Sequence, residues 1–267
     1  PVIISGGGVK HSKAGPQLLR LAESLSIPVA TSLNGKDTFL ANHPLSAGVV
    51  GTYSRGSANR VVGEADLICF IGSKTGGMTT HFWQVPRKGA NAIQIDIDPQ
   101  AIGRNYPLKG AVQGDAQSVL EVMISRMDPS TATRRDGWNY QVKEFVDDWY
   151  KEYNPLLNSD ATPIRPERLC NDLTRLLPDD SFVVVDTGHA GMWMGGMFDV
   201  TSTSQNYVRS AGHLGWAFPA GLGAKCALPE RPVVCFTGDA GFWYHIAEIE
   251  TAVRWNINSI TLVNNNS

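Results

Sequence analysis

Short apolar runs alternate with amphipathic stretches through the first half of the chain. The stretch 13–25 has leucine and alanine residues at helical spacing, which predicts a helix with one buried face. Short strands separated by helices are typical of a parallel sheet that is covered on both faces. The pattern therefore predicts an α/β domain that ends near Met127. Its expected strands are 2–5, 27–30, 65–71 and 92–97.

The second half shows the same alternation. A charged, amphipathic stretch at 138–153 predicts a helix, and Pro166 suits the first turn of another one. Apolar residues at helical spacing predict a single helix over 241–255. The sequence thus predicts a second parallel-sheet domain, with domain 1 at 1–127, a helical linker at 128–164 and domain 2 at 165–267. The expected strands of domain 2 are 181–185, 233–236 and 259–263.

Glycine and aspartate follow the strands of the first domain. Gly6, Gly7 and Gly8 come directly after the first strand and predict a tight turn. They are a weak dinucleotide signal, because the chain does not continue in the Gly-x-Gly-x-x-Gly form. Asp96 and Asp98 end another strand, where turn hydrogen bonding is the favoured interpretation and ribose binding the alternative.

Composition and charge exclude several classes of protein. The chain has 267 residues, 42% of them hydrophobic, and a net charge of −2, which gives no basic surface for nucleic acid. No apolar run reaches membrane-spanning length. The four cysteines lack the spacing of metal ligands and fit a reducing, cytoplasmic setting, and the histidines show no zinc pattern. The chain begins inside a strand-like run and stops one residue after Asn266, so we expect it to be part of a longer protein.

The most informative pattern joins Asp239 to Asn266. Asp239 follows one apolar run and Asn266 follows the next, so a parallel sheet would bring both to the same edge. Gly238 lets backbone approach a phosphate closely, and a helix that starts nearby would offer free N–H groups to an anion. A carboxylate and an amide oxygen suit Mg²⁺, which also accepts diphosphate oxygens. The pattern predicts a site for Mg²⁺ and a diphosphate, with an ordinary strand–turn–helix as the alternative.

Two further segments are candidates for the same site. Residues 186–193 follow a strand, so they form either a second phosphate loop or a simple strand-to-helix turn. Residues 210–219 lead into the small residues 220–224, which fit either a cofactor cradle or a helix that packs closely on its neighbour. Their place in the same domain as Asp239 favours the cofactor interpretation of the first segment.

With these residues in place, the chain resembles the acetolactate synthase-like branch of thiamine diphosphate enzymes. It is similar to their Rossmann-like middle domain, over roughly 1–127, and to the first part of their diphosphate-binding domain, over roughly 165–267. The resemblance implies Mg²⁺ bound by Asp239 and Asn266, a carbonyl of Gly212 that accepts a hydrogen bond from the aminopyrimidine, and Leu214 as an apolar wedge beneath the cofactor. The implied cofactor contacts are Gly188, His189, Ala190, Gly212, Leu214, Gly238, Asp239, Ala240, Gly241 and Asn266.

The sequence also departs from that family. Ala240 replaces a glycine, Gly241 stands where Ser is common, and Leu214 stands where acetolactate synthases commonly have Met. His189 and Ala190 replace a Gln-His pair, which puts that specific activity in doubt. The activating Glu belongs to a pyrimidine-binding domain that this sequence does not contain, so we assign no catalytic residue. Flavin in the middle domain is only partly supported, because Lys74 and Met78 occupy places where flavin-binding members usually carry Arg.

The resemblance implies a thiamine diphosphate- and Mg²⁺-dependent transferase or lyase that acts on 2-oxo acids or related dicarbonyls. Decarboxylation followed by carboligation is the leading expectation. The alternatives are a decarboxylase, an aldehyde lyase or a C–C bond hydrolase of the same family, and a cofactor-binding module without catalysis. Family members assemble with sites between subunits, so we expect a homo-oligomer, with no nucleic-acid or membrane partner.

Overall fold

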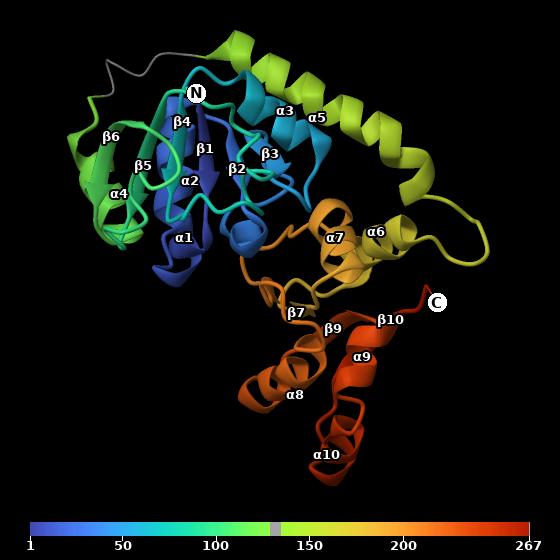
Figure 1. Cartoon of the computed structure of the whole chain (residues 1–267). Helices are drawn as coiled ribbons and strands as arrows, with labels where there is room; N and C mark the ends of the chain where they lie inside the picture. Colours follow the sequence, from blue (N-terminus) through green and yellow to red (C-terminus); the bar gives the residue numbers. More distant parts are fainter. Residues whose placement is uncertain (129–134, 267) are drawn as a thin grey trace. The chain divides into compact units, whose positions relative to one another are not determined.

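The computed structural model describes residues 1–128 and 135–266, and it divides the chain into two compact units (Figure 1). The first unit is Pro1–Asn154 and the second is Pro155–Ser267. Residues 129–134, which belong to the expected linker, and Ser267 lie outside the described part. No helix in the described part is both long enough and apolar enough to cross a membrane.

A six-stranded parallel sheet forms the centre of the first unit. Its order is β3-β2-β1-β4-β5-β6, so the direction of strand progression reverses between β1 and β4. Ligands of open parallel sheets bind outside the carboxyl ends of the strands at such a reversal. The strands are β1 (Val2–Ser5), β2 (Val29–Thr31), β3 (Ser46–Val49), β4 (Ile68–Ile71), β5 (Ala92–Asp96) and β6 (Leu108–Gln113).

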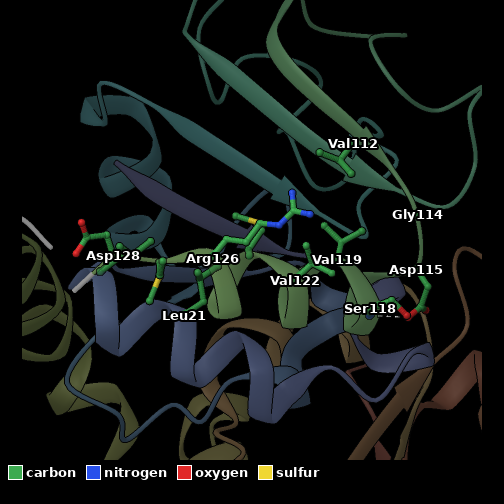
Figure 2. A pocket seen from close by; sticks show the side chains of 12 residues that line it. Leu21, Val112, Gly114, Asp115, Ser118, Val119, Val122, Arg126 and Asp128 are labelled. Atoms are coloured by element: carbon green, nitrogen blue, oxygen red, sulfur yellow. Dashed lines mark hydrogen bonds between the residues drawn. The ribbon is translucent and has the colours of Figure 1, made fainter. Parts of the chain in front are cut away.

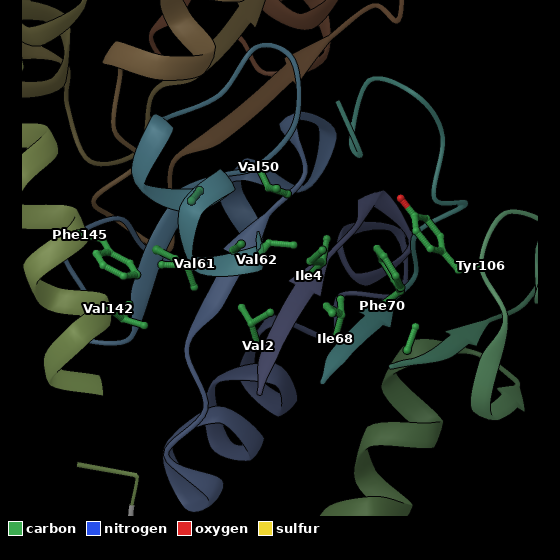
Figure 3. Packing of buried hydrophobic residues seen from close by; sticks show 14 residues of the cluster. Val2, Ile4, Val50, Val61, Val62, Ile68, Phe70, Tyr106, Val142 and Phe145 are labelled. Carbon is green, nitrogen blue, oxygen red and sulfur yellow. The ribbon is translucent and has the colours of Figure 1, made fainter. Parts of the chain in front are cut away.

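Helices cover both faces of this sheet, because its central strands are apolar on both sides. In β1, Val2 and Ile4 point into one buried cluster and Ile3 points into the other. Figure 3 shows the first cluster, to which α3 and α5 contribute side chains together with Val2 and Phe70 of the sheet. Helices α2 and α4 contribute Leu18 and other side chains to the second cluster. The helical segments are α1 (Gly7–His11), α2 (Gly15–Leu25), η1 (Leu33–Thr38), α3 (Gly56–Glu64), α4 (Ala116–Arg126) and α5 (Asp136–Leu157).

The second unit has a four-stranded parallel sheet in the order β10-β9-β7-β8. Helix α8 packs so closely on β9 that a Cβ atom on Gly221 would lie 3.3 Å from the Cβ atom of Cys235. This contact shows that Gly221, one of the small residues of 220–224, serves close packing. The strands are β7 (Phe182–Val185), β8 (Asn206–Arg209), β9 (Val233–Gly238) and β10 (Ile260–Asn264). The helices are α6 (Pro166–Leu176), α7 (His189–Met197), α8 (Ala217–Ala227), α9 (Asp239–Tyr244) and α10 (Glu248–Arg254).

These two units confirm the predicted α/β fold with two parallel sheets. The prediction of a tight turn at Gly6–Gly8 was wrong, because Gly7 and Gly8 already form the first turn of α1. The glycines are explained by a close approach of backbone. A Cβ atom on Gly6 would lie only 2.1 Å from the carbonyl oxygen of Gly72.

The prediction of one helix over 241–255 was also wrong. The segment forms two short helices, α9 and α10, which are separated at residues 245–247. Ile249 and Val253 created the helical pattern, yet these residues are 44% and 76% exposed. They therefore do not form the buried face of a single long helix. At the break, backbone around Gly215 packs tightly, since a Cβ atom there would lie 2.7 Å from the Cβ atom of Tyr244.

We expect Phe70→Ala to lower the free energy of unfolding of the first unit by about 3–5 kcal/mol, because it removes a fully buried ring that stacks on Tyr106. Hydrogen exchange of the β1 and β4 amides measures this loss. Val122→Ala is the control, since Val122 is 48% exposed and its truncation should change stability by less than about 0.5 kcal/mol. Equal effects of the two changes would contradict the assignment of Phe70 to the core.

Candidate functional site

A pocket of about 380 Å³ lies where β7, β9 and β10 end. The parallel register places Val185 beside Phe236, and Asn264 beside Gly238, so the segments that follow these strands emerge at one edge of the sheet. All predicted site residues except Gly212 line this pocket. Its lining consists of Asp186, Thr187, Gly188, His189, Ala190, Leu214, Gly238, Asp239, Ala240, Gly241, Asn264 and Asn266.

One wall of the pocket is the start of helix α7. Gly188 precedes this helix with a φ of +73°, a conformation that glycine adopts readily, and no side chain caps the helix there. The first N–H groups of a helix have no partners within it, and they form the positive end of its dipole. His189 is exposed at the same end of α7 and Ala190 is buried. This wall is therefore suited to an anion.

A second part of the lining holds Asp239, which directly follows β9 and begins α9. A Cβ atom on Gly238 would have no atom within 4 Å, so the backbone there is open to an incoming group. The carboxylate of Asp239 has no hydrogen-bond or ion-pair partner within residues 1–128 and 135–266. In the same described part, no three His, Cys, Asp or Glu residues form a metal-binding group. A cation at Asp239 would therefore need oxygens from a bound anion, from Asn266 or from water.

Leu214 lies over the glycine that starts α7. A Cβ atom on Gly188 would be 3.6 Å from Cδ2 of Leu214, whose side chain is 47% exposed. The next residue, Gly215, has a φ of +81° and is buried. Gly212, with a φ of +96°, is exposed and lies outside the lining of the pocket. The loop thus presents Leu214 to the pocket, between two glycines whose positive φ angles restrict which residues can occupy their positions.

Three further residues line the pocket that were not predicted as individual cofactor contacts: Asp186 and Thr187, which lie in the candidate segment 186–193, and Asn264. Asp186 is only 1% exposed and accepts hydrogen bonds from the backbone N–H groups of Thr187 and Gly215. It is the first polar residue after the buried strand β7, which is a signal that the sequence contains. Asn264 stands beside Gly238 in the sheet. It was overlooked in the sequence because the two asparagines that follow it were taken as the motif.

Burial and charge also affect Cys235, which precedes the pocket on β9. Burial raises the pKa of the Cys235 thiol to about 12, and the negative charge of Asp186 adds to that shift. Burial alone raises the pKa of Cys69 to about 12. Neither thiol is suited to nucleophilic chemistry at neutral pH.

The carboxyl ends of β1 and β4 were the other candidate site, for a dinucleotide or a flavin. There the N–H group of Gly8 donates to the carbonyl of Gly72 at 2.9 Å, and the N–H group of Asp98 donates to Asp96. The second bond confirms the turn interpretation of Asp96. Lys74 pairs with Asp98 at 3.1 Å, and this hydrogen bond lowers the pKa of the Asp98 carboxyl. These groups therefore already make hydrogen bonds or ion pairs with one another within the first unit.

A larger hollow of about 790 Å³ lies on the first unit beside α2, α4 and β6 (Figure 2). Its lining includes Val112, Val119 and Val122, and one of its two acidic residues, Asp115, accepts a hydrogen bond from the N–H group of Ser118. That bond caps helix α4, so the polar group serves the fold. The hollow brings together none of the predicted site residues.

Two protein-family models match the chain. The model described as thiamine pyrophosphate enzyme, central domain, matches residues 1–123. The model described as thiamine pyrophosphate enzyme, C-terminal TPP binding domain, matches residues 186–267. The second match contains every residue that lines the 380 Å³ pocket.

Curated proteins are similar over nearly the whole chain. A probable acetolactate synthase large subunit of Methanococcus aeolicus is 34% identical, over 96% of this chain and 45% of its own length. The acetolactate synthase isozyme 3 large subunit of Escherichia coli (strain K12) is 30% identical, over 100% and 46%. The sulfoacetaldehyde acetyltransferase of Alcaligenes xylosoxydans xylosoxydans is 29% identical, over 96% and 47%. The chain spans about half the length of these relatives.

We expect iodoacetamide at pH 8 to modify Cys226 in the folded chain and to leave Cys69 and Cys235 unmodified. Cys226 is exposed, whereas a pKa of about 12 leaves only about one buried thiol in ten thousand as thiolate at pH 8. Timed labelling followed by peptide mass spectrometry gives the three rates, with the unfolded chain as the control. Labelling of Cys235 as fast as Cys226 in the folded chain would contradict the burial of β9.

Proposed function

The chain belongs to the thiamine pyrophosphate enzyme family, and from this premise we propose that the pocket beside β7, β9 and β10 binds the diphosphate of thiamine diphosphate together with Mg²⁺. One observation carries the proposal. The Asp239 carboxylate faces no partner in the described part of the chain, and it stands beside the open backbone of Gly238. A dipositive ion held by Asp239 and Asn266 would offset the charge of both the carboxylate and the diphosphate.

The remaining lining residues have distinct proposed roles. His189 and Ala190 lie in the first turn of α7, where backbone N–H groups can donate to phosphate oxygens. Ala240 and Gly241 follow Asp239 in the chain and continue the backbone that lines this part of the pocket. Leu214 is the proposed apolar wedge that supports the bent cofactor, and its loop also carries Gly212, whose carbonyl is the proposed acceptor for the aminopyrimidine.

The proposed substrates are 2-oxo acids or related dicarbonyls. Thiamine diphosphate supplies a nucleophilic carbon and an electron sink for such substrates when it is bound. This chain contributes the anion-binding wall, the metal carboxylate and the apolar support of Leu214. Decarboxylation followed by carboligation is the favoured reaction, because two of the relatives carry the name acetolactate synthase and match the chain almost throughout.

A second candidate is another reaction of the same family: simple decarboxylation, aldehyde cleavage, hydrolysis of a C–C bond, or transfer to a different acceptor. His189 and Ala190, which replace the Gln-His pair of acetolactate synthases, favour it. The similarity to a sulfoacetaldehyde acetyltransferase favours it as well. Formation of acetolactate from pyruvate, by this chain assembled with a pyrimidine-binding domain, separates the two candidates. An assembled complex without any activity would instead indicate a cofactor-binding module.

We further propose that residues 1–127 and 165–267 are a middle domain and part of a diphosphate-binding domain, joined by the linker 128–164. The relatives are about twice as long as this chain, which supports placing the activating Glu in a separate domain. An enzyme assembled from such domains would have its sites between subunits of a homo-oligomer. Flavin in the first unit stays a prediction with partial support, because Lys74 and Met78 stand where flavin-binding members usually carry Arg.

Calorimetric titration with thiamine diphosphate tests the proposal. We expect binding by the wild-type chain only when Mg²⁺ is present, and we expect Asp239→Ala to weaken it more than about a hundredfold, since even groups behind a metal ligand contribute ten- to hundredfold. Asp180→Ala removes an exposed carboxylate of the same unit and is the matched control. Equal binding by the Asp239→Ala and Asp180→Ala variants would contradict the assigned metal site.

A further inference from the structure

Asp186 is a buried carboxylate at the carboxyl end of β7, and its partners are all neutral. Its side chain accepts hydrogen bonds from the N–H group of Thr187 at 2.8 Å, the N–H group of Gly215 at 3.0 Å and the hydroxyl of Thr237 at 3.0 Å. No Lys, Arg or His within the described residues forms an ion pair with it. Burying an anion without a counter-charge is costly, so these three hydrogen bonds are what offsets the cost of holding the carboxylate there.

The donors to Asp186 belong to the two working walls of the pocket. Gly215 directly follows Leu214, the proposed wedge. Thr237 directly precedes Gly238 and Asp239, the proposed diphosphate and metal residues. A single carboxylate thus connects the loop that supports the cofactor with the strand end that binds its phosphates. Hydrogen bonds to an ionised acceptor are roughly twice as strong as neutral ones, so this connection fixes the position of the Leu214 loop relative to the strand end.

Gly241 makes room for this carboxylate. A Cβ atom on Gly241 would lie 2.7 Å from Oδ2 of Asp186 and 2.9 Å from Oγ1 of Thr237. Both distances are shorter than a Cβ atom can tolerate, so any side chain at position 241 would displace one of these groups. The glycine at 241 and the buried Asp186–Thr237 bond are therefore parts of one arrangement.

We propose that Asp186 is a positioning residue that holds the Leu214 loop in register with the Asp239 strand end, and that Gly241 is required because it leaves space for the Asp186 carboxylate. This inference rests on the proposed function only where it names thiamine diphosphate and Mg²⁺ as the ligands that the two walls bind. The connection itself is a property of the fold. It predicts that loss of Asp186 impairs the binding of the whole cofactor more than the binding of its diphosphate alone.

A double-variant cycle on Asp186→Ala and Gly241→Ser tests the connection. We expect each single change to speed hydrogen exchange of the Gly215 amide by about ten- to hundredfold, because each removes a charge-assisted hydrogen bond. Adding Gly241→Ser to the Asp186→Ala variant should change that rate by less than about threefold, since the carboxylate is then gone and the Thr237 hydroxyl, no longer held by it, can turn away from the new side chain. Full additivity of the two changes would overturn the proposal.

Two further variants keep this test interpretable. Asp186→Asn preserves the shape and one acceptor oxygen, so its Gly215 exchange should be intermediate, and it serves if the Ala variant does not fold. Ser181→Ala is the matched control, because Ser181 is fully buried just before β7 and its hydroxyl accepts a hydrogen bond from Gln205 away from the pocket. Faster Gly215 exchange in Ser181→Ala than in Asp186→Asn would overturn the specific role of Asp186.

Titrations with thiamine diphosphate and with inorganic pyrophosphate, both with Mg²⁺, separate positioning from general structure. We expect Asp186→Asn to weaken thiamine diphosphate binding about tenfold and pyrophosphate binding less than about twofold. Asp239→Ala should weaken both. Equal losses for the two ligands in Asp186→Asn would overturn the positioning role. Absence of pyrophosphate binding to the wild-type chain would contradict the proposed function instead, and the exchange cycle would still decide the role of Asp186.

Discussion

The candidate site depends on the parallel pairing of β9 with both β7 and β10. Because the three strands run in one direction, their polar continuations emerge at the same edge of the sheet. The register then sets which groups meet: Asn264 stands beside Gly238, and Asp186 reaches Thr237 across the sheet. A shift of one residue along β10 would move its side chains to opposite faces and separate Asn266 from Asp239. The pairing of these strands therefore decides which side chains can act together at the site.

The sequence predicted the interior strands and missed most of the edges. Strands such as β1, β4, β7 and β9 are buried on both faces, so they read as continuous apolar runs. The three strands that the pattern did not reveal, β3, β6 and β8, all lie at a sheet edge in the described part of the chain. An edge strand such as β6 is largely exposed and carries no such run. Tertiary pairing rather than local sequence makes these segments strands.

The site shows a similar division. Gly238, Asp239 and Asn266 could be selected because a metal and a phosphate require particular residue types at particular strand ends. The place of Asp186 directly after an apolar run is visible in the sequence, but its role is not, because its partners are distant backbone and hydroxyl groups that only the folded chain brings together. The reason for glycine at position 241 was not evident either, because it also depends on contacts that form only in the folded chain. In the sequence, Gly241 only stands where Ser is common, whereas the structure shows that a side chain there would displace the Asp186 carboxylate or the Thr237 hydroxyl.

Mapping of backbone amide shifts in the isotope-labelled chain tests the central claim most directly, with thiamine diphosphate added in the presence and absence of Mg²⁺. The account predicts Mg²⁺-dependent shifts concentrated at Gly188–Ala190, at Gly238–Gly241 and around Asn266, which lie in one pocket. Shifts centred on Gly6–Gly8 and Gly72 in the first unit would contradict it, because they would place the cofactor at the other sheet.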